Sequence, residues 1–429
     1  MGKMPERLDD RLMTADIRSA LARWHAAAVA AVQGERVFRD HSYVKENVFC
    51  FERGDRSLRL SLPPAGGRLR LVGLGKAALG MARGVRSRLE AAGRDVDDGL
   101  LIVRDAPTVA DAQEPWDIVL GDHPYPGEAS VRAAQRLLEF IGEPRAEDRF
   151  FVVLSGGASA LCALPAPGVT LEEKRRRTLA VMASGASIAE INRVRQQLSA
   201  IKGGRLAAYF APAQFATFAI SDVPGDDPLV IGSAPTWSDT LARRGGRYVV
   251  IATLDDALEA AAHAARKEGV EVVQLGRCLD GSVEEEANRI TQQVMEIEGR
   301  RERSSARRSC VIIAGGEPLV VLRGDGRGGR AQELALRLGR ALASRQDASR
   351  TEVSGLVAGT DGSDGPTTAA GAFFDRSTID RAHAAHFDVG RALESNDSGP
   401  VLQAIHDVFI TGPTGTNVAD ILMVVIPGR

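Results

Sequence analysis

Two glycine-rich segments near the C-terminus combine residue types that bind anions and metal ions. The first runs from Gly359 to Pro366 and the second from Thr411 to Asn417. Glycines let the backbone turn its N–H groups toward a ligand, and threonine hydroxyls add donors. Asp361 and Asp364 supply hard oxygen ligands suited to Mg²⁺. We therefore expect a phosphate site with a metal ion. The predicted phosphate contacts are Gly359, Thr360, Thr414, Gly415, Thr416 and Asn417.

A third glycine-rich segment, Leu71 to Ala78, joins an apolar run to a helical segment. Its Gly73, Gly75 and Ala78 match the G-x-G-x-x-A pattern that places a helix N-terminus against a pyrophosphate. Lys76 adds a positive charge inside this loop, although the loop lacks the spacing of a Walker A motif. A tight turn between strand and helix is the alternative. We favour a lysine that binds an anionic substrate or a transferring phosphoryl group.

Two other predicted strand ends carry polar residues that suit the same chemistry. Ser155, Gly156 and Gly157 are expected to form a nest of backbone N–H groups, with ordinary packing as the alternative. Asp222 directly follows an apolar run, and ligands of open α/β sheets bind outside the carboxyl ends of strands. Asp222 is therefore a candidate metal ligand or base. The predicted metal ligands are Asp222, Asp361 and Asp364.

The segment Ile191–Arg205 is predicted to be a helix with one donor-rich face. Its apolar residues recur at helical spacing, and Arg195 and Lys202 belong to a row of donors at three- and four-residue steps. A solvated cationic face is the alternative to a substrate-facing helix. The basic runs Lys174–Arg177 and Arg300–Arg308 are expected to be solvated faces or a linker.

Arg330 stands where another helix is expected to begin. This position is unfavourable for a cation, because the N-terminal end of a helix carries partial positive charge. We therefore expect a bound anion beside Arg330. The turn Gly315-Gly316-Glu317 adds a second glycine pair and an acid to the predicted phosphate site.

Composition narrows the class of protein. The 54 basic and 56 acidic residues give a net charge of −2, so no global field recruits nucleic acid or anionic lipid. The four cysteines are far apart, with no zinc spacing, which favours a reducing compartment. The first apolar stretch, Trp24 to Val32, is about half the length of a membrane span. We expect a cytoplasmic protein that contacts neither nucleic acid nor membrane.

Short β-branched runs alternate with helical segments along the chain, which favours an α/β fold with parallel sheets covered by helices. Strands are expected throughout, including Pro318–Leu322, whereas Glu298–Ser309 is expected to be a surface loop. Pro and Gly residues near 235–247 mark the predicted boundary. The predicted domains are 1–240, with an N-terminal helix at about 14–33, and 241–429.

Seven motifs, in their order along the chain, resemble those of the glycerate 2-kinase family, the two-domain kinases with a MOFRL C-terminal domain that are often named hydroxypyruvate reductases. The motifs are Gly75–Ala78, Ser155–Gly157, Asn192–Arg205, Ser221–Pro228, Gly328–Glu333, Gly359–Gly371 and Thr411–Asn417. The resemblance implies a Rossmann-like three-layer αβα N-terminal domain, a smaller α/β domain of MOFRL type from about residue 310, and an active-site cleft between them. It also implies ATP- and Mg²⁺-dependent phosphorylation of D-glycerate at the 2-hydroxyl, which gives 2-phosphoglycerate. The catalytic residues that it implies are Lys76, Arg195, Asp222 and Arg330.

Two other functions fit parts of the sequence. An NAD(P)-dependent hydroxypyruvate reductase would use Gly73-x-Gly75-x-x-Ala78, but it needs one dinucleotide site rather than several anion loops. A non-catalytic sugar-phosphate sensor would leave the aspartates without a role. The expected partner is a small-molecule substrate, and a homodimer is the candidate assembly.

Overall fold

In the computed structural model the described residues are 14–106, 114–184, 188–243, 247–304, 308–344 and 352–428. The chain divides into two compact units. The Rossmann-like unit comprises Val32–Thr253 and Gly415–Val418, and the C-terminal unit comprises the chain up to Ala31, Leu254–Thr414 and the chain from Ala419. The units differ from the predicted domains 1–240 and 241–429, because the first helix groups with the C-terminal unit and the boundary lies near residue 253.

The Rossmann-like unit is built on a six-stranded sheet whose neighbouring strands are all parallel, in the order β6-β5-β4-β7-β8-β9. Every residue of β4 and β7 is buried, as the continuous apolar runs predict for strands covered on both faces. Its strands are β4 (Leu69–Leu74), β5 (Asp98–Val103), β6 (Asp117–Leu120), β7 (Arg149–Leu154), β8 (Gln214–Ile220) and β9 (Tyr248–Ala252).

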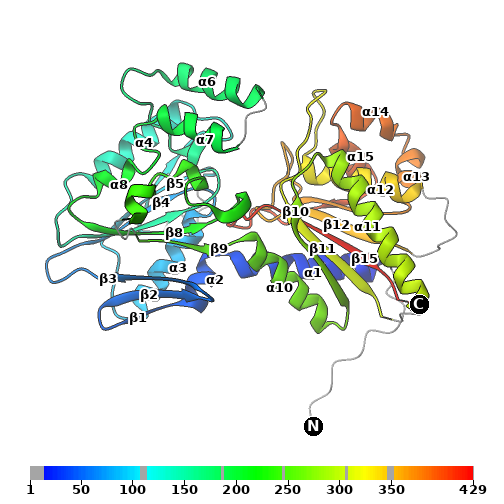
Figure 1. The fold of residues 1–429 in the computed structure, drawn as a ribbon, viewed down its shortest axis with the longest axis horizontal. Coiled ribbons are helices and arrows are strands. Elements are labelled where there is room, and N and C mark those ends of the chain that lie inside the picture. Colours follow the sequence, from blue (N-terminus) through cyan, green and yellow to red (C-terminus); the bar gives the residue numbers. More distant parts are fainter. Residues whose placement is uncertain are drawn as a thin grey trace, which may run out of the picture. The chain divides into compact units, whose positions relative to one another are not determined.

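Helices cover both faces of this sheet, so the predicted three-layer αβα architecture is confirmed. Figure 1 shows α4, α6, α7 and α8 on one side and α2 and α3 on the other. The helices are α2 (Gly34–His41), α3 (Ala78–Glu90), α4 (Glu128–Ile141), α5 (Ala158–Leu161), α6 (Leu171–Ala183), α7 (Ile188–Gln197), α8 (Leu206–Tyr209) and α9 (Asp239–Arg243), with short 3₁₀ turns η2 (Pro224–Asp226) and η3 (Ile231–Ser233).

A three-stranded antiparallel sheet that the sequence pattern did not reveal lies beside α2 and α3. It consists of β1 (Ser42–Lys45), β2 (Val48–Arg53) and β3 (Arg56–Ser61). Phenylalanines join it to the large sheet, because the Phe49 ring lies edge-on to Phe151 with centroids 4.9 Å apart. Such aromatic contacts add stability beyond the area that they bury.

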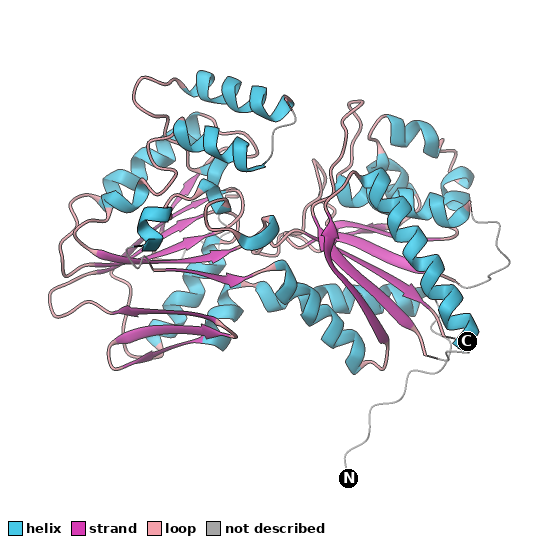
Figure 2. Ribbon diagram, in the orientation of Figure 1, coloured by secondary structure: helices cyan, strands magenta, loops and turns pink. Residues whose placement is uncertain are grey.

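The C-terminal unit also has a six-stranded sheet, in the order β10-β11-β15-β12-β13-β14. Figure 2 shows this sheet with helices around it. Only the β10–β11 pair is parallel, so the expectation of a second parallel sheet was wrong. The strands are β10 (Glu271–Leu279), β11 (Cys310–Gly316), β12 (Ser354–Gly359), β13 (Gly371–Asp375), β14 (Val408–Phe409) and β15 (Asp420–Ile426), and the helices are α1 (Thr14–Val32), α10 (Leu254–Lys267), α11 (Val283–Ser304), α12 (Arg330–Ala343), α13 (Thr378–Ala384), α14 (Val389–Glu394) and α15 (Ser398–Ala404).

Two local predictions in this unit were wrong. Residues 298–304 continue helix α11, whereas the sequence suggested a loop; i,i+4 pairs such as Glu296 with Arg300 explain how so polar a segment stays helical. Pro318–Leu322 forms no strand and pairs only at a single bridge between Ser282 and Leu319. Among the described helices, none is long and apolar enough to cross a bilayer.

Candidate active site

The order of the parallel strands reverses between β4 and β7, and the loops after these two strands meet there. Ligands of doubly wound sheets bind at such a switch point, outside the carboxyl ends of the strands. The Ser155 amide donates to the Leu74 carbonyl at 2.9 Å, and the Lys76 amide donates to the Gly156 carbonyl at 3.0 Å. Two of the predicted anion loops therefore form one continuous surface.

Ser155 is a buried residue that holds these two loops together. Its side chain is fully buried, and its hydroxyl accepts a hydrogen bond from the Ala77 amide at 2.9 Å. Gly75 has φ +121°, and a Cβ at that position would lie 2.4 Å from the Ser155 Oγ. Gly73 lies within β4, where a Cβ would lie 2.5 Å from the Leu101 side chain. The first two glycines of the G-x-G-x-x-A pattern are thus required by close packing, whatever binds above them.

Asp222 follows β8 and lies directly against the second of these loops. A Cβ on Gly156 would lie 1.9 Å from the Asp222 Oδ2, so only glycine leaves room for the carboxylate. The same oxygen accepts a hydrogen bond from the Asn417 Nδ2 at 2.9 Å. Three predicted site residues from distant parts of the sequence therefore meet, namely Gly156, Asp222 and Asn417.

The segment Gly415–Val418 brings Asn417 to this place. The Thr416 hydroxyl donates to the Val32 carbonyl at 2.7 Å and is buried. The Gly415 carbonyl lies against the first turn of α3, 3.5 Å from where a Cβ on Gly80 would be. Thr416 anchors the segment, and the amide of Asn417 is the group that it presents to Asp222.

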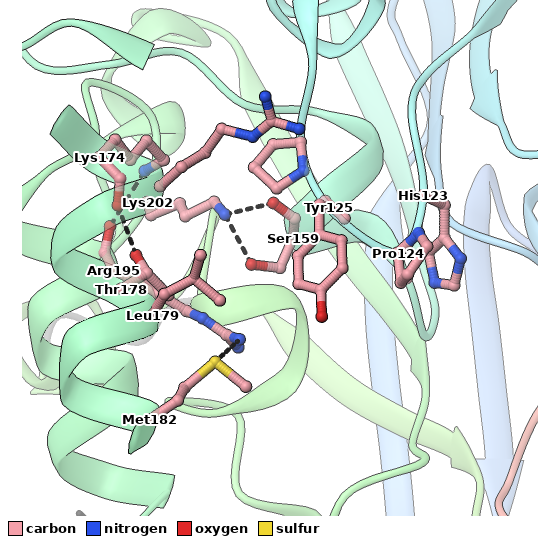
Figure 3. A pocket seen from close by; sticks show the side chains of 14 residues that line it. His123, Pro124, Tyr125, Ser159, Lys174, Thr178, Leu179, Met182, Arg195 and Lys202 are labelled. Carbon is pink, nitrogen blue, oxygen red and sulfur yellow. Dashed lines mark hydrogen bonds between the residues drawn. The ribbon is translucent and has the colours of Figure 1, made fainter. Parts of the chain in front are cut away.

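A cavity of about 710 Å³ adjoins the switch point within the Rossmann-like unit. It opens between α6, the turn after α7 and the loop that follows β6, and Figure 3 shows the side chains that line it. We call it the cation pocket. Its lining comprises His123, Pro124, Tyr125, Pro126, Gly157, Ser159, Ala160, Lys174, Arg175, Thr178, Leu179, Met182, Arg195 and Lys202.

Four cationic side chains line the cation pocket, and none of the described residues in its lining is acidic. Lys202 is buried, and its Nζ donates to the carbonyl and hydroxyl oxygens of Ser159 at 2.5 and 2.6 Å. Lys174 is also buried and donates to the carbonyls of Leu198 and Arg195 at 3.2 and 3.4 Å. The Arg195 guanidinium lies 3.7 Å from the Met182 sulfur.

The burial and proximity of these basic side chains lower the pKa values of both lysines. Burial, with a further contribution from Arg195, lowers the pKa of Lys174 to about 8. Burial also lowers the pKa of Lys202 well below its ordinary value, and the charges of Lys174 and Arg195 act in the same direction. The pocket thus holds positive charges that lack a carboxylate among their neighbours in the lining.

Two sequence-based interpretations change here. Lys174 was assigned to a solvated basic run, yet it is buried in the pocket wall. Helix α7 ends at Gln197 rather than continuing to Arg205, because the Ala200 amide and the Ser199 hydroxyl bond to the Leu164 carbonyl. Arg195 and Lys202 still reach one pocket, although they do not share a helix face.

The glycine-rich loop after β12 is held mainly by bonds within the C-terminal unit. The buried Thr360 hydroxyl donates to the Ala419 carbonyl at 2.7 Å, and the Thr414 hydroxyl donates to the Thr360 carbonyl at 2.6 Å. Asp361 accepts bonds from the amide and the hydroxyl of Ser363 at 3.0 and 3.1 Å. This is an Asx-turn, and a Cβ on Gly359 would lie 3.3 Å from the same Asp361 oxygen.

Asp364 caps helix α12. Its two carboxylate oxygens accept from the Ala331 amide at 3.0 Å, and from the Gln332 amide and side chain at 2.8 and 3.0 Å. Burial, assisted by the charge of Asp420, raises the pKa of Asp364 to about 6 against the effect of these donors. Its oxygens therefore already serve the helix N-terminus.

Arg330 begins α12 as predicted, but the anion that neutralises it belongs to the protein. Its guanidinium donates to Asp420 and to Glu317, each at 2.6 Å. These carboxylates account for the cation at the helix N-terminus without a bound ligand, and the predicted anion contact of Arg330 stays a prediction. Gly315 and Gly316 end β11, and a Cβ on Gly316 would overlap the Leu279 carbonyl of β10, so strand packing explains this glycine.

Comparison with known proteins decides the family. Residues 20–266 match the domain of unknown function DUF4147, and residues 310–420 match the MOFRL family. The D-glycerate 2-kinase of Thermotoga maritima is 33% identical over 403 residues, which cover 86% of this chain and 93% of that protein. The chain belongs to the glycerate 2-kinase family.

Other members of the glycerate 2-kinase family agree in extent but carry different names. A protein of Agrobacterium vitis described as a putative hydroxypyruvate reductase is 35% identical over 396 residues, covering 84% of this chain and all of that protein. The crystal structure of the Thermotoga maritima glycerate kinase superposes with a TM-score of 0.75 at 30% identity, covering 96% of this chain and 100% of that one. The predicted resemblance and fold are confirmed.

Among the residues that the structure describes, no three or more His, Cys, Asp or Glu side chains lie together so that they could hold a metal ion. The predicted ligands Asp361 and Asp364 make the turn and the helix cap described above. Sequence reasoning did not single out Lys174, Ser159 or His123 as site residues. Only the structure shows that residues 174, 178 and 182 of α6 line the pocket at four-residue steps.

Proposed function

We propose that the protein is a glycerate 2-kinase that transfers the γ-phosphoryl group of ATP to the 2-hydroxyl of D-glycerate. The observation that carries the proposal is the constellation at the switch point, where Lys76, the Gly156–Gly157 turn, Asp222 and Asn417 come together. Phosphoryl transfer needs positioned cations and N–H donors more than covalent chemistry. The activities of the relatives support the same reaction.

In the proposed mechanism Lys76 neutralises charge on the transferred phosphoryl group. The side chain of Lys76 leaves the loop beside Gly157, where a Cβ would lie 3.4 Å from the Lys76 Cγ. The 2-hydroxyl oxygen forms a bond to the γ-phosphorus as the bond to the β–γ bridging oxygen breaks. ADP leaves, and Asp222 accepts the hydroxyl proton while Asn417 holds its carboxylate in place.

The donor set at the switch point fits a Mg²⁺ ion that arrives with the nucleotide. Mg²⁺ in such sites uses one or two carboxylates together with substrate phosphates and water. Asp222 supplies one carboxylate at a strand end, and it is the residue that would hold the ion there. When bound, Mg²⁺ neutralises phosphate charge. Asp364 does not fit this role because its oxygens cap α12.

Arg195 assists from the cation pocket in this proposal, whereas Arg330 remains a predicted contact of the C-terminal unit. We also propose a cytoplasmic location, since the widely spaced cysteines form no disulfide framework. A homodimer stays a prediction.

The reaction is tested by mixing the purified protein with D-glycerate, Mg²⁺ and ATP and following ADP release. Phosphorus NMR identifies the product, and NAD(P)H oxidation with hydroxypyruvate is measured in parallel. We expect glycerate-dependent ADP release and a 2-phosphoglycerate signal. NAD(P)H oxidation without ADP release would reject the kinase and reinterpret the Gly73–Ala78 loop as a dinucleotide site.

A further inference from the structure

The cation pocket combines several basic side chains with exposed apolar ones, and the proposed transfer site at the switch point does not account for this combination. We propose that this pocket binds the nucleotide, with Lys174, Arg195 and Lys202 contacting its phosphates and Tyr125, Leu179 and Met182 covering its base. This inference rests on the proposed kinase function. It assigns the adenine and phosphate sites to one cavity of the Rossmann-like unit.

Charge is the first argument. Lys174 and Lys202 are each only 2% exposed, and Arg195 and Arg175 join them in a lining without acidic residues. Gathering like charges away from water is unfavourable, and the lowered pKa values of both lysines report that cost. A triphosphate carries several negative charges and can compensate all of these cations. The single carboxylate of glycerate would leave most of them unpaired.

The cations are also held in position before any ligand arrives. The Ser159 hydroxyl that binds Lys202 lies 3.0 Å from the Ser233 hydroxyl, which in turn donates to the Asn192 Oδ1 at 2.9 Å. This chain of bonds links α5, η3 and α7 around the Lys202 ammonium group. A surface lysine that pairs with nothing in particular would have no such support. Preorganised donors of this kind are typical of phosphate sites.

Size and polarity provide the second argument. A cavity of about 710 Å³ is within the usual range for drug-sized ligands and far exceeds what a three-carbon acid fills. Its apolar residues are unusually exposed for their type, with Tyr125 56%, Leu179 47% and Met182 43% exposed. Aromatic and thioether side chains suit the faces of an aromatic base. The pocket therefore matches a molecule with one polyanionic and one aromatic part.

The pocket also leads to the transfer site. Gly157 belongs to its lining and to the loop that hydrogen-bonds across the switch point. A Cβ on Gly157 would lie 3.4 Å from the Lys76 Cγ and 3.4 Å from the His123 ring. Phosphates that start at Lys174 and Lys202 would thus end beside Lys76, where the terminal phosphoryl group is needed.

Calorimetric titration of the full-length protein with three probes tests the proposal. The probes are Mg²⁺ with the non-hydrolysable ATP analogue AMP-PNP, inorganic tripolyphosphate, and D-glycerate. We expect Arg195→Gln to weaken binding of AMP-PNP and tripolyphosphate by about 10- to 100-fold and to leave glycerate binding unchanged. Arg193→Gln is the matched control, because Arg193 is exposed on the same helix and lies outside the pocket lining.

A second variant separates the base from the phosphates. Leu179→Ser should weaken AMP-PNP binding several-fold and leave tripolyphosphate binding unchanged. Leu179 is half-exposed on α6, so this variant keeps its fold, and a thermal melt confirms that for each variant.

The results that would overturn the proposal are specific. Unchanged AMP-PNP affinity in Arg195→Gln, or a selective loss of glycerate binding, would show that the pocket takes the acceptor or nothing. Failure of the kinase function is a separate outcome. A protein that binds AMP-PNP through Arg195 but never phosphorylates glycerate would support this pocket and reject the acceptor.

Discussion

Asp222 illustrates how much of the candidate chemistry depends on contacts between single residues. Its place at a strand end was predictable, but its surroundings were not. Gly156 leaves the space that the carboxylate occupies, and Asn417 binds the carboxylate oxygen from the other end of the sequence. Each neighbour offers a way to disturb Asp222 without removing it.

We predict that Gly156→Ala abolishes most activity while the protein stays folded. The added methyl would lie 1.9 Å from the Asp222 Oδ2, so the carboxylate must move. Turnover should fall by about 10²-fold or more, because small misplacements of reacting groups have effects of that size. Gly299→Ala is the control, since this helical glycine has its nearest neighbour 3.5 Å from the added carbon. If Gly156→Ala and Gly299→Ala had equal activity, the proposed catalytic role of Asp222 would be wrong.

Lys76→Ala should lower kcat by about 10²- to 10³-fold, the usual effect of removing one group that stabilises a transition state. The loop should survive, because its bonds to Gly156 and Ser155 use the backbone of residues 76 and 77. Circular dichroism and ADP release on the same sample check both parts. Lys45→Ala, at an exposed strand position, is the control. A variant with intact turnover would disprove the role given to Lys76.

Nucleotide affinity should fall as pH rises through about 8. The pKa of Lys174 is lowered to about 8, so its ammonium group is charged below that pH and neutral above it. Arg195, Lys202 and His123 face the same cavity. Titrations with AMP-PNP between about pH 6.5 and 9.5, about one and a half units on either side of that pKa, measure the effect. In Lys174→Met the affinity should be weaker and its decline above pH 8 reduced; an identical pH profile would exclude Lys174.

At the scale of elements, strands covered on both faces were predictable and small or exposed ones were not. Long apolar runs revealed β4, β7 and β8. In contrast, β14 has two residues, and β1 to β3 are short strands that each include exposed residues. The apolar run Pro318–Leu322 was wrongly predicted to be a strand, because apolar composition does not show whether a segment pairs with a neighbouring strand. Leu322 is in fact 81% exposed. Hydrogen bonds to distant segments, such as those of residues 199 and 200 that end α7, leave no local signal.

Some residues of the candidate site could likewise be predicted from the sequence and others could not. Lys76, Asp222 and Asn417 were recognisable by residue type next to glycine or a strand end. Lys174 was not, because a basic run looks the same in sequence whether one of its members is buried or all are solvated. Threonines and aspartates of the loop after β12 mostly serve local bonds, which sequence cannot separate from ligand contacts.

Helix α12 provides the prediction at this scale. Asp364→Ala should lower the free energy of unfolding by about 1–3 kcal/mol, because it removes a buried cap and leaves amide donors unsatisfied. Thermal unfolding measures this. The Mg²⁺ concentration that gives half-maximal activity should not change. A shift in that concentration without a change in stability would restore Asp364 as a metal ligand. Asp380→Ala, exposed in the first turn of α13, is the control.

At the scale of the whole molecule, the order of the chain does not follow its division into units. Helix α1 precedes the Rossmann-like unit but belongs to the C-terminal one, and residues 415–418 belong to the opposite unit from their neighbours. Arg18 of α1 pairs with Asp407 at 2.5 Å and with Asp375 at 3.2 Å. The fragment 241–429, which the sequence suggested as a domain, would therefore lack part of its own structure.

Arg18→Ala should weaken the C-terminal unit selectively. Asp407 is fully buried, so the loss of a partner leaves its charge less compensated. Hydrogen exchange followed by mass spectrometry should show faster exchange in β13 and β14 and unchanged exchange in β4 and β7. Arg36→Ala, at an exposed i,i+4 pair with Asp40, should change neither. Equal effects on the sheets of both units would contradict the assignment of α1.

The position of Asn417 has a consequence for how the protein is made. The amide that holds Asp222 lies 195 residues after it, so it is synthesised long after the large parallel sheet. A product of premature termination, or of tail cleavage by a protease, can retain every strand of the large parallel sheet and still lack this group. Such copies would keep the sheet and the cation pocket but lack the amide that positions Asp222, so we expect them not to complete the transfer.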